Sequence, residues 1–99
     1  MKLIYGMPGT GKTKELLKLS QDNNVVILAE SEARVQRLLV KAAGYGFRIP
    51  TPITLDDLNE NIKEVYVDDI ERFFNVAFNV KVKTITINKD EDLELEHLN

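Results

Sequence analysis

The 99-residue sequence predicts an α/β fold, a three-layer sandwich in which helices cover a mainly parallel sheet of about four strands. Three observations predict it. A short apolar run is followed by a glycine-rich loop and then by strong helix formers. Apolar runs then alternate along the chain with segments of helical periodicity. The length allows one domain, near the lower size limit for such a core.

The first predicted strand is the apolar run Leu3 to Tyr5, and the loop after it has the pattern G-x-x-x-x-G-K-T. The residues of this pattern are Gly6, Met7, Pro8, Gly9, Thr10, Gly11, Lys12 and Thr13. A chance match is expected in roughly 0.4% of chains of this length. The alternative is a glycine turn that only caps a helix. The order of strand, loop and helix favours a phosphate-binding loop over that alternative.

Each residue type in this loop has a physical role in holding phosphates. The glycines can adopt positive φ, so that successive N–H groups converge on phosphate oxygens. Lys12 begins a helix over residues 12–20 and can place its ammonium between the β- and γ-phosphates. Thr13 offers a hydroxyl to Mg²⁺. The expected ligands are therefore Mg²⁺ and ATP, the latter chosen on frequency because no residue is identifiably placed to read the base.

The second predicted strand, residues 25–29, is a continuous apolar run of the kind buried in parallel sheets. Ser31 is suited to cap the helix that follows. Apolar residues then recur at helical spacing before residues 44–46 end the helix: Val35, Leu38, Leu39 and Ala42. This face should pack on the sheet.

The other face of that helix is basic. Arg34, Arg37 and Lys41 lie about one turn apart, and Arg48 follows shortly after. They are candidates for contacts with nucleic-acid phosphates. The preferred alternative is an ordinary solvated helix face supported by nearby acids, and no interleaved aromatic residues indicate base stacking.

Residues 47–63 carry Pro50 and Pro52, followed by what looks like a capped helical turn at residues 54–58. We expect a short strand or turn there. The next apolar run, Val65 to Val67, ends in Asp68 and Asp69. Ligands of a nucleotide-binding sheet gather at the carboxyl ends of its strands, so Asp68 is placed to orient Mg²⁺ and Asp69 to polarise the attacking water. The alternative is a helix that starts with two acids.

Helical spacing then predicts a helix whose apolar positions are Ile70, Phe73, Phe74 and Ala77, with the aromatic residues in the core. Asn79 turns the chain. Residues 82–88 are rich in β-branched side chains and predict a fourth strand that ends at Asn88.

The net charge of −3 is unevenly distributed. Residues 90–99 carry five acids and no base, whereas residues 1–89 carry thirteen bases and eleven acids. We therefore expect a nucleotide-binding domain at 1–89 and an acidic tail at 90–99. The tail is either a solvated, partly disordered end or, because Leu93 and Leu95 alternate with acids, a short edge strand.

Other classes are excluded by composition. The absence of cysteine rules out disulfides and thiolate metal sites, and the single His97 leaves no imidazole cluster for zinc. No apolar run is long enough to span a membrane and no secretory signal is present, so we expect a cytoplasmic protein.

These motifs resemble those of the P-loop NTPase superfamily, within it the division that carries an extra strand between the loop strand and the acidic strand, which includes helicases and recombinase-like ATPases. The resemblance implies a sheet ordered 2-3-4-1, with Asp69 as the catalytic acid and Asn88 as a polar sensor. Two departures matter. The catalytic acid in this division is usually Glu, so hydrolysis by Asp69 is expected to be slow, and no arginine finger is evident unless Arg48 or Arg72 serves, for example from a neighbouring subunit.

A second resemblance is to thymidine kinases, in which an acid such as Asp69 acts as a base on a nucleoside hydroxyl. This chain is too short for the nucleoside-enclosing lobe and lacks the cysteines of that family.

The leading hypothesis is a weak Mg·ATPase that acts with single-stranded DNA or a larger protein assembly, with a homo-oligomer as a candidate assembly state, by analogy with accessory proteins of viruses and mobile elements. The alternatives are a nucleotide-responsive interaction module without turnover and a degenerate scaffold. Intact Lys12, Thr13 and Asp68 argue against the scaffold.

Overall fold

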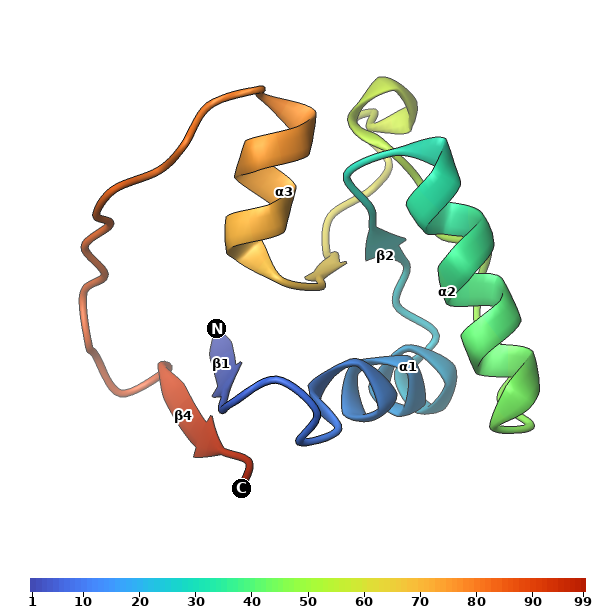
Figure 1. Ribbon diagram of the computed structural model, residues 1–99, viewed down its shortest axis with the longest axis horizontal. Helices are drawn as coiled ribbons and strands as arrows, with labels where there is room; N and C mark the ends of the chain where they lie inside the picture. Colours follow the sequence, from blue (N-terminus) through green and yellow to red (C-terminus); the bar gives the residue numbers. More distant parts are fainter.

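The computed structural model describes residues 1–99 and contains three α-helices, four short strands and one turn of 3-10 helix (Figure 1). In chain order the elements are β1 (Lys2–Tyr5), α1 (Lys12–Asn23), β2 (Ile27–Leu28), α2 (Glu32–Gly44), η1 (Leu55–Asp57), β3 (Tyr66–Val67), α3 (Ile70–Ala77) and β4 (Glu94–His97). The predicted alternation of strands and helices over the first 77 residues is confirmed. None of the helices is long and apolar enough to cross a membrane.

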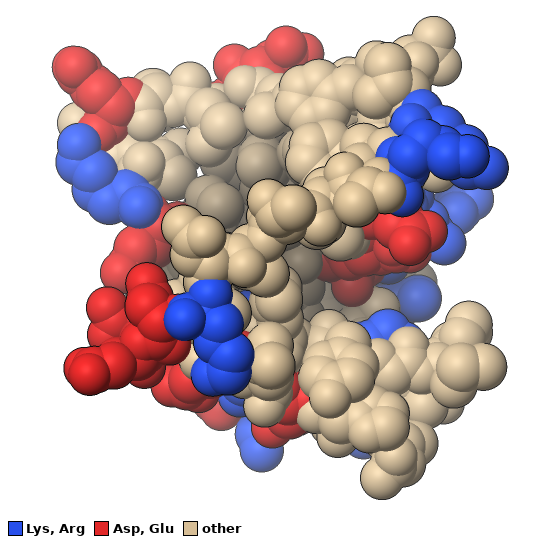
Figure 2. Space-filling model, turned by 90° about the vertical axis from the view of Figure 1, so that its left-hand side faces the viewer, with Lys and Arg blue, Asp and Glu red and all other residues tan.

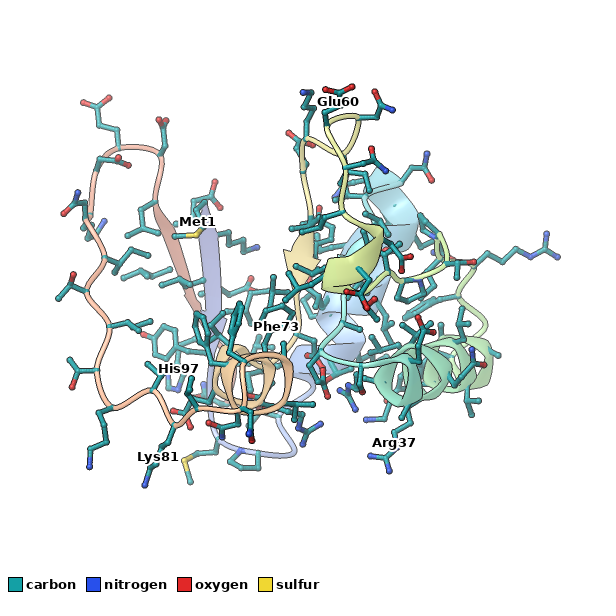
Figure 3. All side chains as sticks on the ribbon, turned by 90° about the horizontal axis from the view of Figure 1, so that it is seen from above. Met1, Arg37, Glu60, Phe73, Lys81 and His97 are labelled. Atoms are coloured by element: carbon teal, nitrogen blue, oxygen red, sulfur yellow. The ribbon has the colours of Figure 1, made fainter.

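The sheet differs from the prediction. The strands form two separate parallel pairs, β1 with β4 and β2 with β3, so a three-layer sandwich on one sheet of about four strands in the order 2-3-4-1 is wrong. In Figures 1 and 3, β4 lies on the side of β1 that faces away from β3, whereas the predicted order places the fourth strand between them. Ile4 of β1 and Tyr66 of β3 line a common hollow of about 340 Å³, so no strand fills the space between them at that end.

Residues 82–88 do not form the predicted fourth strand. They belong to the long connection from α3 to β4, which runs around the outside of the molecule (orange to red in Figure 1). Ile85 and Ile87 are 59% and 43% exposed. β-Branched residues favour a strand only where a neighbouring strand completes the backbone pairing. No strand pairs with this segment, so its propensity is not realised.

The acidic end of the chain takes the place beside β1. Four residue pairs join β1 and β4 in parallel, from Lys2 opposite Glu94 to Tyr5 opposite His97. The rings of Tyr5 and His97 stack with their centroids 4.9 Å apart. Lys2 Nζ also lies 3.6 Å from Glu96 Oε1. Of the two alternatives for this segment, the short edge strand is therefore the one that forms.

The main hydrophobic core lies between α1, α2 and β2. Its six residues are each 3% exposed or less: Leu17, Ile27, Ala29, Val35, Leu38 and Ala42. The predicted apolar face of α2 is confirmed, because three of the six belong to it. Phe73 of α3, 4% exposed, lies between α3 and the strands in Figure 3 and makes edge-to-face contacts with Phe74 and Phe78. Its predicted core position is confirmed.

Several predicted chain reversals and caps are also confirmed. Ser31 accepts a hydrogen bond from the backbone N–H of Arg34 at 3.2 Å and caps α2. Asn79 has a φ of 51° and turns the chain after α3. In the region of residues 47–63, Thr54 and Asp57 form a capping box around η1, and Ile53 forms a parallel bridge with Leu28.

Figure 2 shows the side of the molecule formed by β4 and the connection that precedes it, where uncharged side chains cover most of the middle of the face. Apolar residues of this connection and of β4 that remain exposed are Phe78, Val80, Ile85, Ile87 and Leu95. β4 pairs only with β1, so its other edge has no partner strand. Apolar side chains on this side are therefore more exposed than those of the core between α1, α2 and β2.

Candidate functional site

The loop between β1 and α1 has a backbone conformation that requires its glycines. Gly9 and Gly11 have φ values of 82° and 89°, in the left-handed region that other residues adopt only with strain. Gly11 is the N-cap of α1 and has no side chain to bond the N–H groups of the first helical turn. Those N–H groups and the positive end of the helix dipole suit an anion.

Lys12 folds back over this loop. Its ammonium Nζ donates to the carbonyl oxygens of Gly6 and Met7, both at 2.7 Å. The hydroxyl of Thr10 donates to the same Met7 carbonyl at 2.8 Å. Hydrogen bonds between two charged groups are stronger than those to a neutral carbonyl, so a phosphate could draw the ammonium away from the loop.

The end of the chain fixes the start of the loop. Leu98 donates its backbone N–H to the carbonyl of Tyr5 at 2.8 Å. A Cβ at Gly6 would collide with the Leu98 carbonyl oxygen. Glycine is therefore needed at position 6 because of a close approach by a segment more than ninety residues away, in addition to any contact with a ligand.

Thr13 and Asp68 meet although 55 residues separate them. Thr13 lies in the first turn of α1 and its hydroxyl donates to Asp68 Oδ1 at 3.1 Å. Asp68 directly follows β3 and is 7% exposed. The two residues predicted to hold Mg²⁺ are therefore adjacent.

Arg34 binds the second oxygen of Asp68, a contact that the sequence pattern did not predict. Its guanidinium makes an ion pair and hydrogen bond with Asp68 Oδ2, and Arg34 is only 6% exposed. The prediction that Arg34 belongs to an exposed basic stripe is corrected accordingly. The sequence gives only an ambiguous signal: Arg34 lies four and eight residues before the buried Leu38 and Ala42, on the same line along the helix, but its spacing fits the basic face equally well.

The other residues of the basic stripe are at the surface. Arg37 and Lys41 are exposed on α2, and Arg37 projects outward in Figure 3. Arg48 is also exposed, and its backbone N–H donates to the side chain of Gln21 at 2.7 Å.

Asp69 is the N-cap of α3. It has a φ of 53°, and its Oδ1 accepts a hydrogen bond from the backbone N–H of Arg72 at 3.2 Å. The Arg72 side chain lies 3.9 Å from Asp69 Oδ2, and both side chains are about half exposed. The helix-start alternative therefore describes what Asp69 does in this structure.

Asn88 lies on the exposed connection between α3 and β4. No strand lies directly before Asn88, so the prediction that this residue ends a strand is wrong.

Glu30 was not predicted as a site residue, yet its Oε2 is buried and has no hydrogen-bond partner. The parallel register of Leu28 with Val67 brings the ends of β2 and β3 to one edge, so Glu30 follows β2 where Asp69 follows β3.

Mg²⁺ takes oxygen ligands and usually keeps several waters and phosphate oxygens. No group of three or more His, Cys, Asp or Glu side chains is arranged so that it could hold a metal ion. Thr13 and Asp68 supply two adjacent oxygens. This set fits a magnesium ion that arrives with phosphates.

Comparison of the chain with models of protein families, with curated proteins and with solved structures finds no match. The geometry of the loop, Asp68 and Arg34 is therefore what bears on function.

Proposed function

We propose that this chain binds a magnesium nucleotide, with loop residues 6–13 around the phosphates and Asp68 beside the metal. The observation that carries the proposal is the hydrogen bond between Thr13 and Asp68. It joins the last residue of the loop to the one buried carboxylate at the end of β3. Two motifs that are far apart in the sequence thus form a single polar site.

The chain's own groups account for most of the binding. The uncapped N–H groups of α1 and the Lys12 ammonium attract phosphate oxygens, and Thr13 and Asp68 supply oxygens to the cation. Magnesium, when bound, neutralises phosphate charge and orients the phosphates. ATP is the proposed nucleotide, with slow hydrolysis as the proposed reaction.

A second candidate is nucleotide binding without turnover, and the position of Asp69 favours it. Asp69 Oδ1 is used to cap α3, and the Arg72 side chain lies near Oδ2. A carboxylate held in this way is less available to polarise a water molecule. Binding of nucleotide would then change contacts with a protein partner instead of driving a reaction.

The direct test is a calorimetric titration of the purified protein with ATP, ADP and GTP, each in the presence of Mg²⁺. Saturable binding of at least one of them at a stoichiometry near one supports the proposal. Lack of binding to all three contradicts it. Phosphate release, measured with and without single-stranded DNA, then separates a nucleotide hydrolase from a module that only binds.

The variant Asp69→Asn tests the proposed catalytic role of this residue. Asparagine caps helices as well as aspartate, so the stability of α3 and the affinity for nucleotide should not change. An amide cannot accept the proton of an attacking water, so phosphate release should fall by about 10²-fold or more. If phosphate release persists, Asp69 is not the base, and Glu30→Gln becomes the next variant to measure.

We propose that the remaining basic residues of α2 contact the phosphates of a nucleic acid. Reversing two charges in Arg37→Glu/Lys41→Glu should weaken binding to single-stranded DNA and lower the slope of log K against log salt concentration by about 2. The control is Lys81→Glu/Lys83→Glu, which changes the net charge equally on the connection after α3. Equal losses in the two variants, or no binding of the unmodified protein at low salt, would remove this surface as a specific contact.

A further inference from the structure

Both oxygens of the buried Asp68 carboxylate are already engaged. Thr13 donates to Oδ1 at 3.1 Å, and the Arg34 guanidinium is paired with Oδ2. Arg34 and Asp68 are 6% and 7% exposed, so water screens this ion pair only weakly. The carboxylate proposed to face a metal ion is therefore neutralised by a cation of the chain itself.

A divalent cation and the guanidinium could not share this carboxylate at low cost. A magnesium ion bound between Thr13 and Asp68 would lie within a few ångströms of the Arg34 charge. Like charges at such distances repel each other strongly where water does not screen them. Occupation of the metal position therefore requires the Arg34 guanidinium to move.

Arg34 also has an unused hydrogen-bond donor. Its Nε atom is buried and has no hydrogen-bond partner. A buried N–H without a partner is unfavourable, so the guanidinium is incompletely satisfied in its position beside Asp68. A phosphate group offers several oxygens to the planar fork of arginine and can accept two of its N–H groups at once.

We propose that Arg34 competes with the divalent cation for Asp68 and exchanges the carboxylate for a phosphate oxygen when nucleotide binds. Arg34, on the first turn of α2, then takes the place of a metal ion beside Asp68 in the empty protein. It keeps the metal position weak in the empty protein and adds affinity for phosphate. This proposal deepens the proposed function. Only the exchange of Asp68 for a phosphate oxygen rests on nucleotide binding, whereas the competition with the metal ion does not.

The test compares Arg34→Gln with Lys18→Gln, which removes an exposed positive charge from α1 outside the site. The first measurement is Mn²⁺ binding to the nucleotide-free protein by water-proton relaxation, since Mn²⁺ prefers the same oxygen ligands as Mg²⁺. The second is calorimetric ADP binding in EDTA, without any metal. Arg34→Gln should bind Mn²⁺ about tenfold more tightly and ADP several-fold more weakly, whereas Lys18→Gln should change neither affinity.

These opposite changes distinguish competition from structural damage, because a misfolded site loses both affinities. The Mn²⁺ measurement contains no nucleotide, so it tests Arg34 even if the protein proves to bind none. If Arg34→Gln does not fold, Arg34→Lys keeps the charge and is expected to bind Mn²⁺ as weakly as the unmodified protein. In the unmodified protein, the NMR resonance of the Arg34 Nε–H group should also shift when ADP is added in the absence of metal ions. Unchanged or weaker Mn²⁺ binding by Arg34→Gln, tighter binding by Arg34→Lys, or an unshifted resonance in ADP-bound protein would each overturn the proposal.

Discussion

The variant Lys12→Ala is expected to lower the affinity for Mg·ATP by at least about tenfold, or about 1.4 kcal/mol, without unfolding the protein. The Lys12 ammonium bonds only to atoms of the loop, namely the carbonyls of Gly6 and Met7 and the hydroxyl of Thr10, so its removal takes nothing from the hydrophobic core. A phosphate bound in the loop would lose its closest positive charge.

Calorimetry with ATP and ADP measures the effect, and thermal unfolding of the free protein checks that the fold is retained. Lys18→Ala is the matched control, because Lys18 is exposed on the same helix and outside the loop. Equal affinities for the unmodified protein and Lys12→Ala would contradict the assignment of residues 6–13 as the phosphate-binding loop.

The variant Asp68→Ala is expected to reduce the free energy of unfolding by about 3–5 kcal/mol. Arg34 would remain buried at 6% exposure without its counterion, and the Thr13 hydroxyl would lose its acceptor. An uncompensated buried charge is more costly than the loss of an exposed ion pair, for which the typical effect is about 0–1 kcal/mol.

Urea denaturation measures this change. The control Asp56→Ala removes an exposed acid from η1 and should change the unfolding free energy by less than about 1 kcal/mol. The double variant Asp68→Leu/Arg34→Met replaces both charges with apolar side chains and should recover most of the stability. A small effect of Asp68→Ala would mean that water reaches Arg34 and that the pair is not buried in solution.

Sequence reasoning predicted the candidate site best where the motif is contiguous. The loop conformation follows from Gly9 and Gly11, whose positive φ needs no information from the rest of the chain. Ser31 as a cap and Val35, Leu38 and Ala42 as a buried face likewise follow from helical geometry. The contact of Asp68 with Thr13 was also predicted, but on the assumption of a single sheet. β1 and β3 belong to separate strand pairs, so the contact forms although the expected sheet does not.

The role of Arg34 could not be read in the same way. Its spacing suits both the exposed basic face and the buried line with Leu38 and Ala42. An arginine prefers the first position unless a buried acid compensates its charge. That acid, Asp68, is 34 residues away, so only the packing of α2 against the end of β3 decides between the two positions.

The sequence by itself determined the local features of this protein: the positions of the helices, the left-handed glycines of the loop, the caps and the turn at Asn79. These depend on interactions within a few residues. Only the tertiary structure decided which segments pair as strands. Residues 82–88 have the stronger β propensity, yet β4 pairs with β1 because it supplies a continuous backbone ladder, stacked Tyr5 and His97 rings and a charge partner for Lys2. Strand pairing joins groups some ninety residues apart, and local propensity carries no information about that choice.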